Sequence, residues 1–406
     1  MLRTSRLWPW VAGLLLVLAL PARPDFSAAA KNLSNTPAQD SLYPKVVREP
    51  YTGIACVIWV EKVGETDKLY LSRTLDEGAT WSAPQLLSGS GQILEGTSDL
   101  ADYYAISMVA DVPYLHIVMQ WRSDSSSDFE ILYRRSDDLG ETWDDWVTLT
   151  ANTTDSLHPD VAARAGYVHV VYEDSWPGNP EIIYKRIASN GAGAVDQTRR
   201  LTFSSSFSIY PRIAASKSGS IVNIAYEDGQ SGQSNIYYKR IIDYGAGTFE
   251  TRQLTFGTGP TEWNSLPDIT TSTSSDGQYV YIVYQCGWAG NREIMYKRLD
   301  KFGASTGTTY TARLTYSVTE SRSNSIDFDA AYNYVHVSYH DDWSGNYDIM
   351  TKKLPDYGGG GFTGQRVSWG TGDSSHSTIA ASGASAFVVW SDNSSGNYEI
   401  LIKKGS

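Results

Sequence analysis

The sequence has little of several features that define common protein classes. Only two cysteines, Cys56 and Cys286, occur in 406 residues, which excludes a disulfide-rich scaffold. Lysine and arginine number 33 against 45 aspartate and glutamate residues, and no basic run is present, so nucleic acid is not an expected partner. Beyond residue 20, no apolar stretch is long enough to span a bilayer, and no segment has clear helical periodicity. These absences leave an acidic, β-rich protein without a membrane span.

The first thirty residues have the organisation of a signal peptide. Arg3 and Arg6 provide a positive start, residues 11–20 form a short apolar run, and small residues follow at 28–30. We therefore expect residues 1–30 to be removed and the mature chain to be secreted or periplasmic. Aromatic residues make up 12% of the sequence, which suits strands, where flat side chains pack well on a pleated surface.

Internal repetition is the strongest signal. Residues 211–240 read as Pro-x-Ile, a turn, an alternating strand, a Gly-rich turn and a further strand. The pattern recurs at 159–186, 267–298, 326–353 and 379–404, with two weaker copies before residue 136. Alignment on the third strand matches Leu69, Ile131, Ile182, Ile236, Ile294, Ile349 and Ile400, which are 62, 51, 54, 58, 55 and 51 residues apart. Seven copies with this period predict one all-β domain over residues 31–406, a seven-bladed β-propeller of four-stranded blades.

The ends of the domain predict how the ring closes. The seventh copy lacks a fourth strand, whereas residues 31–35 precede the first copy as Leu201 and Thr202 precede the fourth. We expect the N-terminal segment to complete the last blade as its outer strand, which leaves no long open edge. Cys56 and Cys286 then fall in blades one and five, too far apart to form a disulfide, so two free thiols are expected.

Two copies continue into the pattern S/T-x-D-x-G-x-T-W, at residues 74–81 and 136–143. The motif residues are Asp76, Gly78 and Trp81 in the first, and Asp138, Gly140 and Trp143 in the second. The pattern resembles the Asp-box of BNR repeats in sialidase-like propellers. That resemblance implies a structural box on the face opposite the active site. The other copies are similar in layout to TolB-type repeats. Such propellers host hydrolases, lyases, lectins and scaffolds, so the resemblance implies a fold more than a function.

The turns between second and third strands carry aromatic and acidic residues at matching positions, and histidines begin two inner strands. The candidate ligand-binding residues are Trp176, Trp288, Trp343, Asp174, Asp341, His158 and His376. In one interpretation the tryptophans stack on sugars; in the other, each tryptophan packs on the adjacent blade and each aspartate caps its own turn. Regular recurrence favours the structural interpretation. No cofactor is expected, although the acidic residues 341–348 offer oxygen ligands of the kind that calcium prefers.

Irregular positions are the better candidates for catalysis. The resemblance to sialidases implies an arginine cluster that holds a substrate carboxylate, and a tyrosine nucleophile activated by a glutamate. The weak candidates for these roles are Arg212, Arg322, Tyr210 and Glu262. The Arg-Ile-Pro signature of the family is missing, because the first blade reads Tyr-Pro-Lys-Val at residues 43–46. A polysaccharide lyase would instead use a histidine and a tyrosine as base and acid.

Three functional hypotheses follow. The first is a secreted, monomeric propeller that binds a glycan or another extracellular ligand, including a protein, on its between-blade loops. The second is a glycan-active enzyme, either a sialidase-like exo-glycosidase or a polysaccharide lyase. The third is a protein-interaction scaffold of the TolB-like kind. An arginine cluster that converges on the channel mouth would favour the second hypothesis.

Overall fold

The structure, a computed structural model, describes residues 26, 28–49, 52–95, 102–176, 178–216, 218–257, 262–272, 278–288, 290–383 and 385–405. Most of the expected signal peptide lies outside these residues. Within them, no helix is long and apolar enough to cross a membrane.

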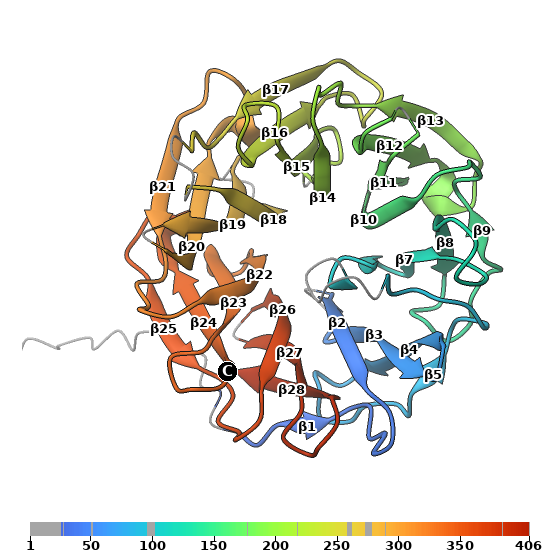
Figure 1. Cartoon of the computed structure of the whole chain (residues 1–406), viewed down its shortest axis with the longest axis vertical. Helices are drawn as coiled ribbons and strands as arrows, with labels where there is room; N and C mark the ends of the chain where they lie inside the picture. Colours follow the sequence, from blue (N-terminus) through green and yellow to red (C-terminus); the bar gives the residue numbers. More distant parts are fainter. Residues whose placement is uncertain are drawn as a thin grey trace, which may run out of the picture.

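The described residues form seven four-stranded antiparallel sheets arranged in a ring (Figure 1). We call the space enclosed by their first strands, which holds a cavity of about 320 Å³, the channel. Blade 1 contains β2 (Ser41–Arg48), β3 (Ala55–Val63), β4 (Thr66–Thr74) and β5 (Gln85–Leu86). Blade 2 contains β6 (Ile106–Asp111), β7 (Tyr114–Trp121), β8 (Glu130–Ser136) and β9 (Val147–Thr148). Blade 3 contains β10 (Ser156–Arg164), β11 (Tyr167–Asp174), β12 (Glu181–Ile187) and β13 (Val195–Arg200).

The remaining blades repeat this order. Blade 4 contains β14 (Ser208–Ala215), β15 (Val222–Asp228), β16 (Asn235–Ile241) and β17 (Phe249–Gln253). Blade 5 contains β18 (Asn264–Thr271), β19 (Val280–Trp288), β20 (Asn291–Leu299) and β21 (Thr309–Arg313). Blade 6 contains β22 (Ser321–Asp329), β23 (Tyr334–Asp341), β24 (Asp348–Leu354) and β25 (Thr363–Arg366). The predicted seven-bladed propeller is confirmed.

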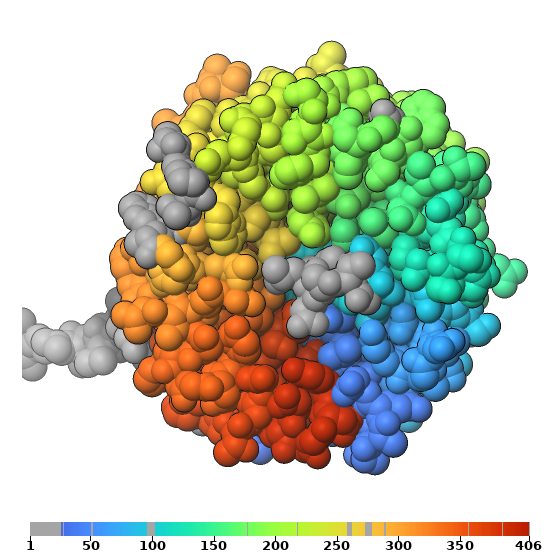
Figure 2. All heavy atoms as spheres, viewed as in Figure 1, coloured from blue at the N-terminus to red at the C-terminus, as the bar shows by residue number. Residues whose placement is uncertain are grey.

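Blade 7 combines the two ends of the domain. Its first three strands are β26 (Ser374–Ser382), β27 (Ser385–Asp392) and β28 (Glu399–Gly405), and its outer strand is β1 (Lys31–Asn32). Lys31 pairs with Ile402 and Asn32 with Leu401. Figure 1 shows blue β1 beside red β28, and in Figure 2 the first and last blades meet in a closed disc.

Neighbouring blades pack face to face through apolar side chains. Between blades 3 and 4, for example, Ile182 and Tyr184 pack with Ile213 and Ile224, and all four are nearly inaccessible to solvent. The alternation seen in the sequence places these residues on the buried faces of their sheets. Both cysteines are free and buried, in blades 1 and 5. Burial raises the pKa of the Cys56 thiol to about 12.

The two Asp-box motifs fasten the turns that follow the third strands of blades 1 and 2. Asp138 accepts hydrogen bonds from the Thr142 amide (2.8 Å) and hydroxyl (2.6 Å). Asp76 makes the same pair of bonds with Thr80, and these bonds lower the pKa of Asp76 to about 2. Gly78 and Gly140 adopt positive φ, as such a turn requires. Trp81 packs on Phe387 of the last blade, with ring centroids 5.8 Å apart.

A second repeated contact joins a blade to the next one at five places around the channel. The acceptor is the side chain of the residue before the last one of a second strand, and the donor is a backbone N–H near the start of the first, inner strand of the next blade. The donor–acceptor pairs are Tyr43–Ser391 (3.2 Å), His158–Gln120 (2.9 Å), Tyr210–Glu173 (2.9 Å), Leu266–Glu227 (3.3 Å) and His376–His340 (3.3 Å). Each donor has positive φ and lies in a β-bulge of its inner strand. We call these contacts the inter-blade ties.

Gln120→Ala tests an inter-blade tie. Gln120 is fully buried and also donates a hydrogen bond to the Ile93 carbonyl (3.0 Å), so its loss leaves two buried backbone groups unpaired. We expect the free energy of unfolding to fall by about 1–3 kcal/mol. Chemical denaturation measures this change, with Gln230→Ala, an exposed glutamine in a turn, as the matched control. Equal stability of the two variants would show that the tie contributes nothing.

Candidate functional site

One edge of every blade carries the start of the first strand, the end of the second, the start of the third and the end of the fourth. In blade 3, Ser156 pairs with Asp174, which in turn pairs with Glu181 at the start of β12. The turns of this edge and the loops between blades together form one face of the disc, which we call the connecting face. The Asp-boxes lie in turns of the opposite face.

A buried ion-pair cluster lies at the channel end of this face. His158 Nδ1 lies 2.8 Å from Glu173, and His158 Nε2 lies 3.1 Å from Glu95. Burial by itself would lower the pKa of His158, but the two carboxylates reverse the effect and raise it to about 10. His158 is therefore a cation at neutral pH. Its ring lies beside that of Tyr210, with centroids 4.8 Å apart.

Two tyrosines, Tyr103 and Tyr104, fill the channel below the connecting face. The Tyr103 hydroxyl donates to the Ser377 carbonyl across the ring (3.0 Å), and Lys45 Nζ lies 3.4 Å from the Tyr103 ring centroid. Arg212 lies beside Tyr104 and is paired with Asp160 and Asp268 at 3.4 and 3.1 Å. A cavity of about 320 Å³ that includes Lys45 and Arg212 in its wall extends along the inner strands. Arg212 thus belongs to the channel, not to an arginine cluster on the connecting face.

A pocket of about 290 Å³ lies between blades 4 and 5, beside the channel end. Its wall consists of Tyr210, Glu227, Ser234, Trp263, Ser265, Leu266, Gln285 and Arg292. Inner strands supply Tyr210 and Leu266, second strands supply Glu227 and Gln285, and the start of β20 supplies Arg292. The predicted residue Tyr210 therefore lies in a concave site with a carboxylate, an amide and a guanidinium.

Glu227 is the titratable group of this pocket. Its carboxylate accepts hydrogen bonds from the Ser234 hydroxyl (2.5 Å) and the Leu266 amide (3.3 Å). Burial raises the pKa of Glu227 to about 7, against the lowering effect of these two donors. Burial, reinforced by Glu173 and Glu227, also raises the pKa of Tyr210. A protonated phenol and a carboxyl group that titrates near neutrality therefore share one pocket.

Gln285 occupies the position of the tie acceptors in blade 5 but makes no tie. Both its amide nitrogen and its amide oxygen are buried and have no hydrogen-bond partner among the described residues. A buried amide without partners costs folding free energy, and such groups are uncommon in native proteins. Because Gln285 lies in the pocket wall, a hydroxyl-rich ligand there would satisfy both its donor and its acceptor.

Two arginines meet at one carboxylate next to the pocket. Arg292 lies 2.8 Å from Glu320 Oε2. Arg322 donates two hydrogen bonds to the same oxygen, one from Nη2 and one from Nε (2.7 Å). The guanidinium of Arg292 is stacked near Trp263, 5.4 Å from its ring centroid. Both arginine side chains keep more than a quarter of their surface exposed, so the trio carries one excess positive charge at the surface.

The structure separates other residues that the sequence grouped together. Glu262 lines a different cavity, of about 300 Å³, with Phe256, Cys286 and Lys297. His376 is buried against Tyr43 and Tyr103, with ring centroids 4.8 and 5.7 Å away.

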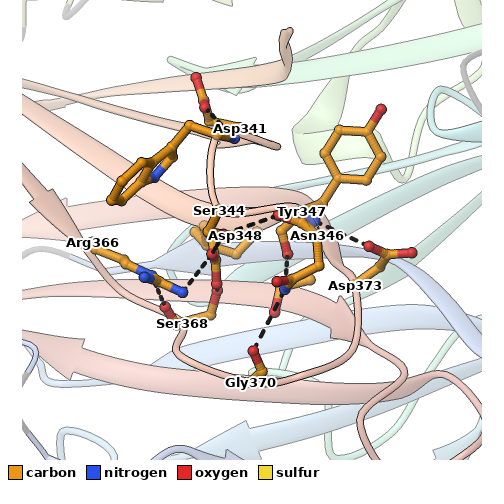
Figure 3. Close-up of polar contacts among 12 residues, drawn as sticks. Asp341, Ser344, Asn346, Tyr347, Asp348, Arg366, Ser368, Gly370 and Asp373 are labelled. Atoms are coloured by element: carbon orange, nitrogen blue, oxygen red, sulfur yellow. Dashed lines mark hydrogen bonds and ion pairs between the residues drawn. The ribbon is translucent and has the colours of Figure 1, made fainter. Parts of the chain in front are cut away.

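The acidic residues of the second-to-third turns fasten their own blades. Asp341 accepts from the Ser321 hydroxyl (2.7 Å) and the Trp343 amide (3.0 Å), and Asp174 accepts in the same way from Ser156 and Trp176. Figure 3 shows this turn of blade 6, where Asn346 also reaches the Gly370 carbonyl. The described residues hold no group of three or more His, Cys, Asp or Glu side chains suited to a metal ion.

Two tryptophans of these turns are largely exposed to solvent. Trp176 and Trp343 leave 68% and 58% of their surface exposed. The side chain of Trp288, at the end of β19, lies outside the described residues.

Sequence reasoning missed Glu227, Gln285 and Arg292, because each occupies a regular position in the repeat. A signal was nevertheless present. The second strands of blades 3 and 4 end in Glu-Asp, whereas blade 5 ends this stretch with Gln285 and Cys286. Arg292 likewise replaces the proline or tyrosine that follows Gly-Asn in blades 3, 6 and 7.

No protein-family model and no curated protein matches the chain. Solved structures do match its fold. The polysaccharide lyase PL25, an ulvan lyase, superposes with a TM-score of 0.58 at 10% identity, over 92% of this chain and 95% of that one. The GH93 α-L-arabinofuranosidase of Fusarium graminearum gives 0.53 at 12% identity, over 82% and 98%. The Hadza microbial sialidase Hz136 gives 0.52 at 14% identity, over 85% and 76%.

The chain has the sialidase-like propeller fold. At these identities the similarity concerns the fold alone, and the residues of the pocket carry the functional argument.

The charge of His158 has a consequence for pH stability. Its folded-state pKa of about 10 exceeds the ordinary value of 6.5, so its contribution is complete below pH 6.5 and disappears as pH rises through 10. We expect the stability difference between the native protein and His158→Gln to shrink over this range. Thermal unfolding at a series of pH values measures it. His169→Gln is the control, because burial lowers the pKa of His169 to about 3 and its difference should stay constant.

Proposed function

We propose that this protein is an exported enzyme that cleaves an acidic glycan in the pocket between blades 4 and 5. The propeller neighbours include glycoside hydrolases and a polysaccharide lyase, which supports a glycan-active enzyme over a propeller that only binds. Export through residues 1–30 and action as a monomer belong to the same proposal.

The unsatisfied amide of Gln285 is the observation that carries the proposal. Each of the five tie acceptors accepts a hydrogen bond from the next blade, whereas neither amide atom of Gln285, which lies in the pocket wall, has a partner among the described residues. Sugar hydroxyls both donate and accept hydrogen bonds, so a pyranose or furanose ring satisfies both atoms at once. The same pocket holds Glu227 and Tyr210, which supply the chemistry.

Tyr210 and Glu227 form a nucleophile and base pair in this proposal. The raised pKa of Tyr210 keeps its phenol protonated, so attack on an anomeric carbon requires a base to take the proton. Glu227 has a pKa of about 7 and lines the same pocket, so its carboxylate is the base. Attack breaks the glycosidic bond and gives a glycosyl–tyrosine intermediate, and the leaving oxygen takes a proton from solvent. Water then hydrolyses this intermediate to release the sugar, and Glu227 returns its proton to the phenolate.

The arginine pair defines the substrate class. Arg292 and Arg322 share a single carboxylate and so retain the capacity to bind an anion. Guanidinium groups bind carboxylates and sulfates through paired hydrogen bonds. A sugar acid at the pocket mouth therefore fits the charge and the geometry better than a neutral sugar does.

A lyase is the second candidate, and the arginine pair favours it as well. Elimination next to a sugar carboxylate requires that carboxylate to be neutralised, and a tyrosine then passes the proton from the ring carbon to the leaving oxygen. The two reactions are separated by their products. Elimination gives an unsaturated sugar that absorbs ultraviolet light, whereas hydrolysis gives new reducing ends without that absorbance.

The test of the catalytic pair uses Tyr210→Phe and Glu227→Gln on acidic glycans. We expect each variant to lose about 10²–10⁴-fold in kcat/KM while its thermal unfolding stays near that of the native protein. In the native protein kcat/KM should rise with pH through about 7, because Glu227 acts in its deprotonated form. Turnover by Glu227→Gln at the native rate would refute the assignment.

The arginine pair is tested by the double variant Arg292→Ala, Arg322→Ala. Loss of charge-assisted hydrogen bonds to the substrate should raise KM about 10- to 100-fold for a carboxylated substrate. The same substrate with its carboxyl groups reduced to alcohols should be handled equally by native and variant proteins. Arg298→Ala, an arginine paired with Asp300 on the opposite face, is the control. An unchanged KM for the carboxylated substrate would remove the acidic-glycan assignment.

A further inference from the structure

Four consecutive blades expose one aromatic side chain at the same place on the connecting face. Each lies three residues after the end of the outer strand, on the rim of the disc: Phe203, Phe256, Tyr316 and Trp369. Their exposed fractions are 70%, 69%, 69% and 69%. We call these four residues the rim aromatics. A single exposed apolar side chain is normal on a protein surface, so the observation that matters is the recurrence of an aromatic residue at one position of four successive blades.

The fold itself does not require an aromatic residue at this place. The equivalent positions of blades 1, 2 and 7 are Gly89, Ala151 and Asn35, which follow the same Leu-Ser or Leu-Thr pair. Those blades form the same four-stranded sheets. The rim aromatics therefore occupy only the arc of blades 3–6, and the pocket between blades 4 and 5 lies at the middle of that arc.

Three of the rim aromatics are backed by an arginine. The guanidinium carbons of Arg200, Arg313 and Arg366 lie 4.4, 4.6 and 4.4 Å from the ring centroids of Phe203, Tyr316 and Trp369. A guanidinium on one face of a ring fixes its orientation and leaves the other face to solvent.

Each of these arginines is anchored by a buried carboxylate. The partners are Glu181 (2.9 Å), Glu293 (2.7 Å) and Asp348 (2.6 Å), and none of the three is accessible to solvent. Figure 3 shows Arg366 beside Asp348. The arginine side chains remain 30%, 28% and 18% exposed, so the cation is the partner that faces outward. Each pair is neutral overall, but its carboxylate is buried, so the rim presents flat rings with the outward edge of a guanidinium beside three of them.

We propose that the rim aromatics form a second binding site, which holds an acidic polysaccharide chain outside the catalytic pocket. The exposed ring faces stack on the apolar faces of sugar rings, and the guanidinium edges attract carboxylate or sulfate groups. A row that runs over four blades suits a polymer, not a single sugar. The residues after each ring are small and mostly polar, as in Ser204–Ser206 and Gly370–Gly372. Separate rings with polar surroundings differ from the contiguous apolar centre of a protein interface.

The proposal concerns binding and holds whether or not the pocket is catalytic. It is tested with the full-length mature protein in native gels that contain polygalacturonate, alginate or chondroitin sulfate, with dextran as the neutral polymer. We expect retardation in at least one acidic gel and none in dextran. The variant with Phe203, Phe256, Tyr316 and Trp369 all changed to Ala should bind about tenfold more weakly or worse, because all four stacking surfaces are lost.

Two controls make the result specific. The variant Phe249→Ala, Tyr310→Ala, Tyr332→Ala removes three partly exposed aromatic residues of the opposite face and should be retarded like the native protein. The double variant Arg292→Ala, Arg322→Ala, which removes the anion-binding pair beside the pocket, should keep most of its retardation, which separates this site from the pocket. Native mobility of the unmodified protein in every acidic gel would overturn the proposal. Unchanged retardation of the four-residue variant would also overturn it. Equal retardation in dextran would show that charge has no role in the binding.

Discussion

A hydrogen bond between neighbouring blades determines where the inner strands enter the channel. The acceptor is a polar side chain near the end of a second strand, and the donor is a backbone N–H held at positive φ in the bulge of the next inner strand. The bulge turns side chains such as His158 and Tyr210 toward the channel end. The side chains that accept these hydrogen bonds are therefore also the polar groups that surround the channel end. The pocket wall contains Glu227, the acceptor of the tie between blades 4 and 5, and Gln285, whose own tie toward blade 6 is not made.

The channel and the pocket handle charge in opposite ways. In the channel, Arg212 is matched by Asp160 and Asp268, and His158 by two glutamates, so the buried charges are compensated inside the protein. Such compensation is needed where water is excluded, because an isolated buried ion costs several kcal/mol or more. Beside the pocket, by contrast, one glutamate serves two arginines. The excess charge is tolerated there because these side chains reach solvent, and it remains available to a ligand.

The repeat made the fold predictable, because an alternating second strand, such as that of Val168, Val170 and Tyr172, recurs in seven copies with turn residues between the strands. Tyr210 and Arg322 were proposed as site residues because they lie in loops that vary between blades, and the structure places Tyr210 in the pocket wall and Arg322 beside Glu320 next to it. Arg212 was grouped with them, yet its partner Asp268 is 56 positions away and no local pattern indicates that contact. Glu227 was overlooked for the opposite reason. It fits the repeat, and its equivalent Glu173 is just as buried beside Tyr210. The difference lies in their partners: Glu173 is paired with His158, whereas Glu227 accepts from a serine hydroxyl and a backbone amide.

The last blade has a consequence for the order of events during synthesis. Its outer strand precedes all other strands of the propeller and its other three strands follow them, and the contact of Ser34 with Glu399 joins residues 365 positions apart. Six blades can be translated and paired while this sheet still lacks three of its strands. Until the C-terminal residues emerge, the apolar side of blade 1 that contacts Phe387 and Val389 has no cover. The molecule is most open to aggregation and to proteolysis in that interval, and its closure is a single late step.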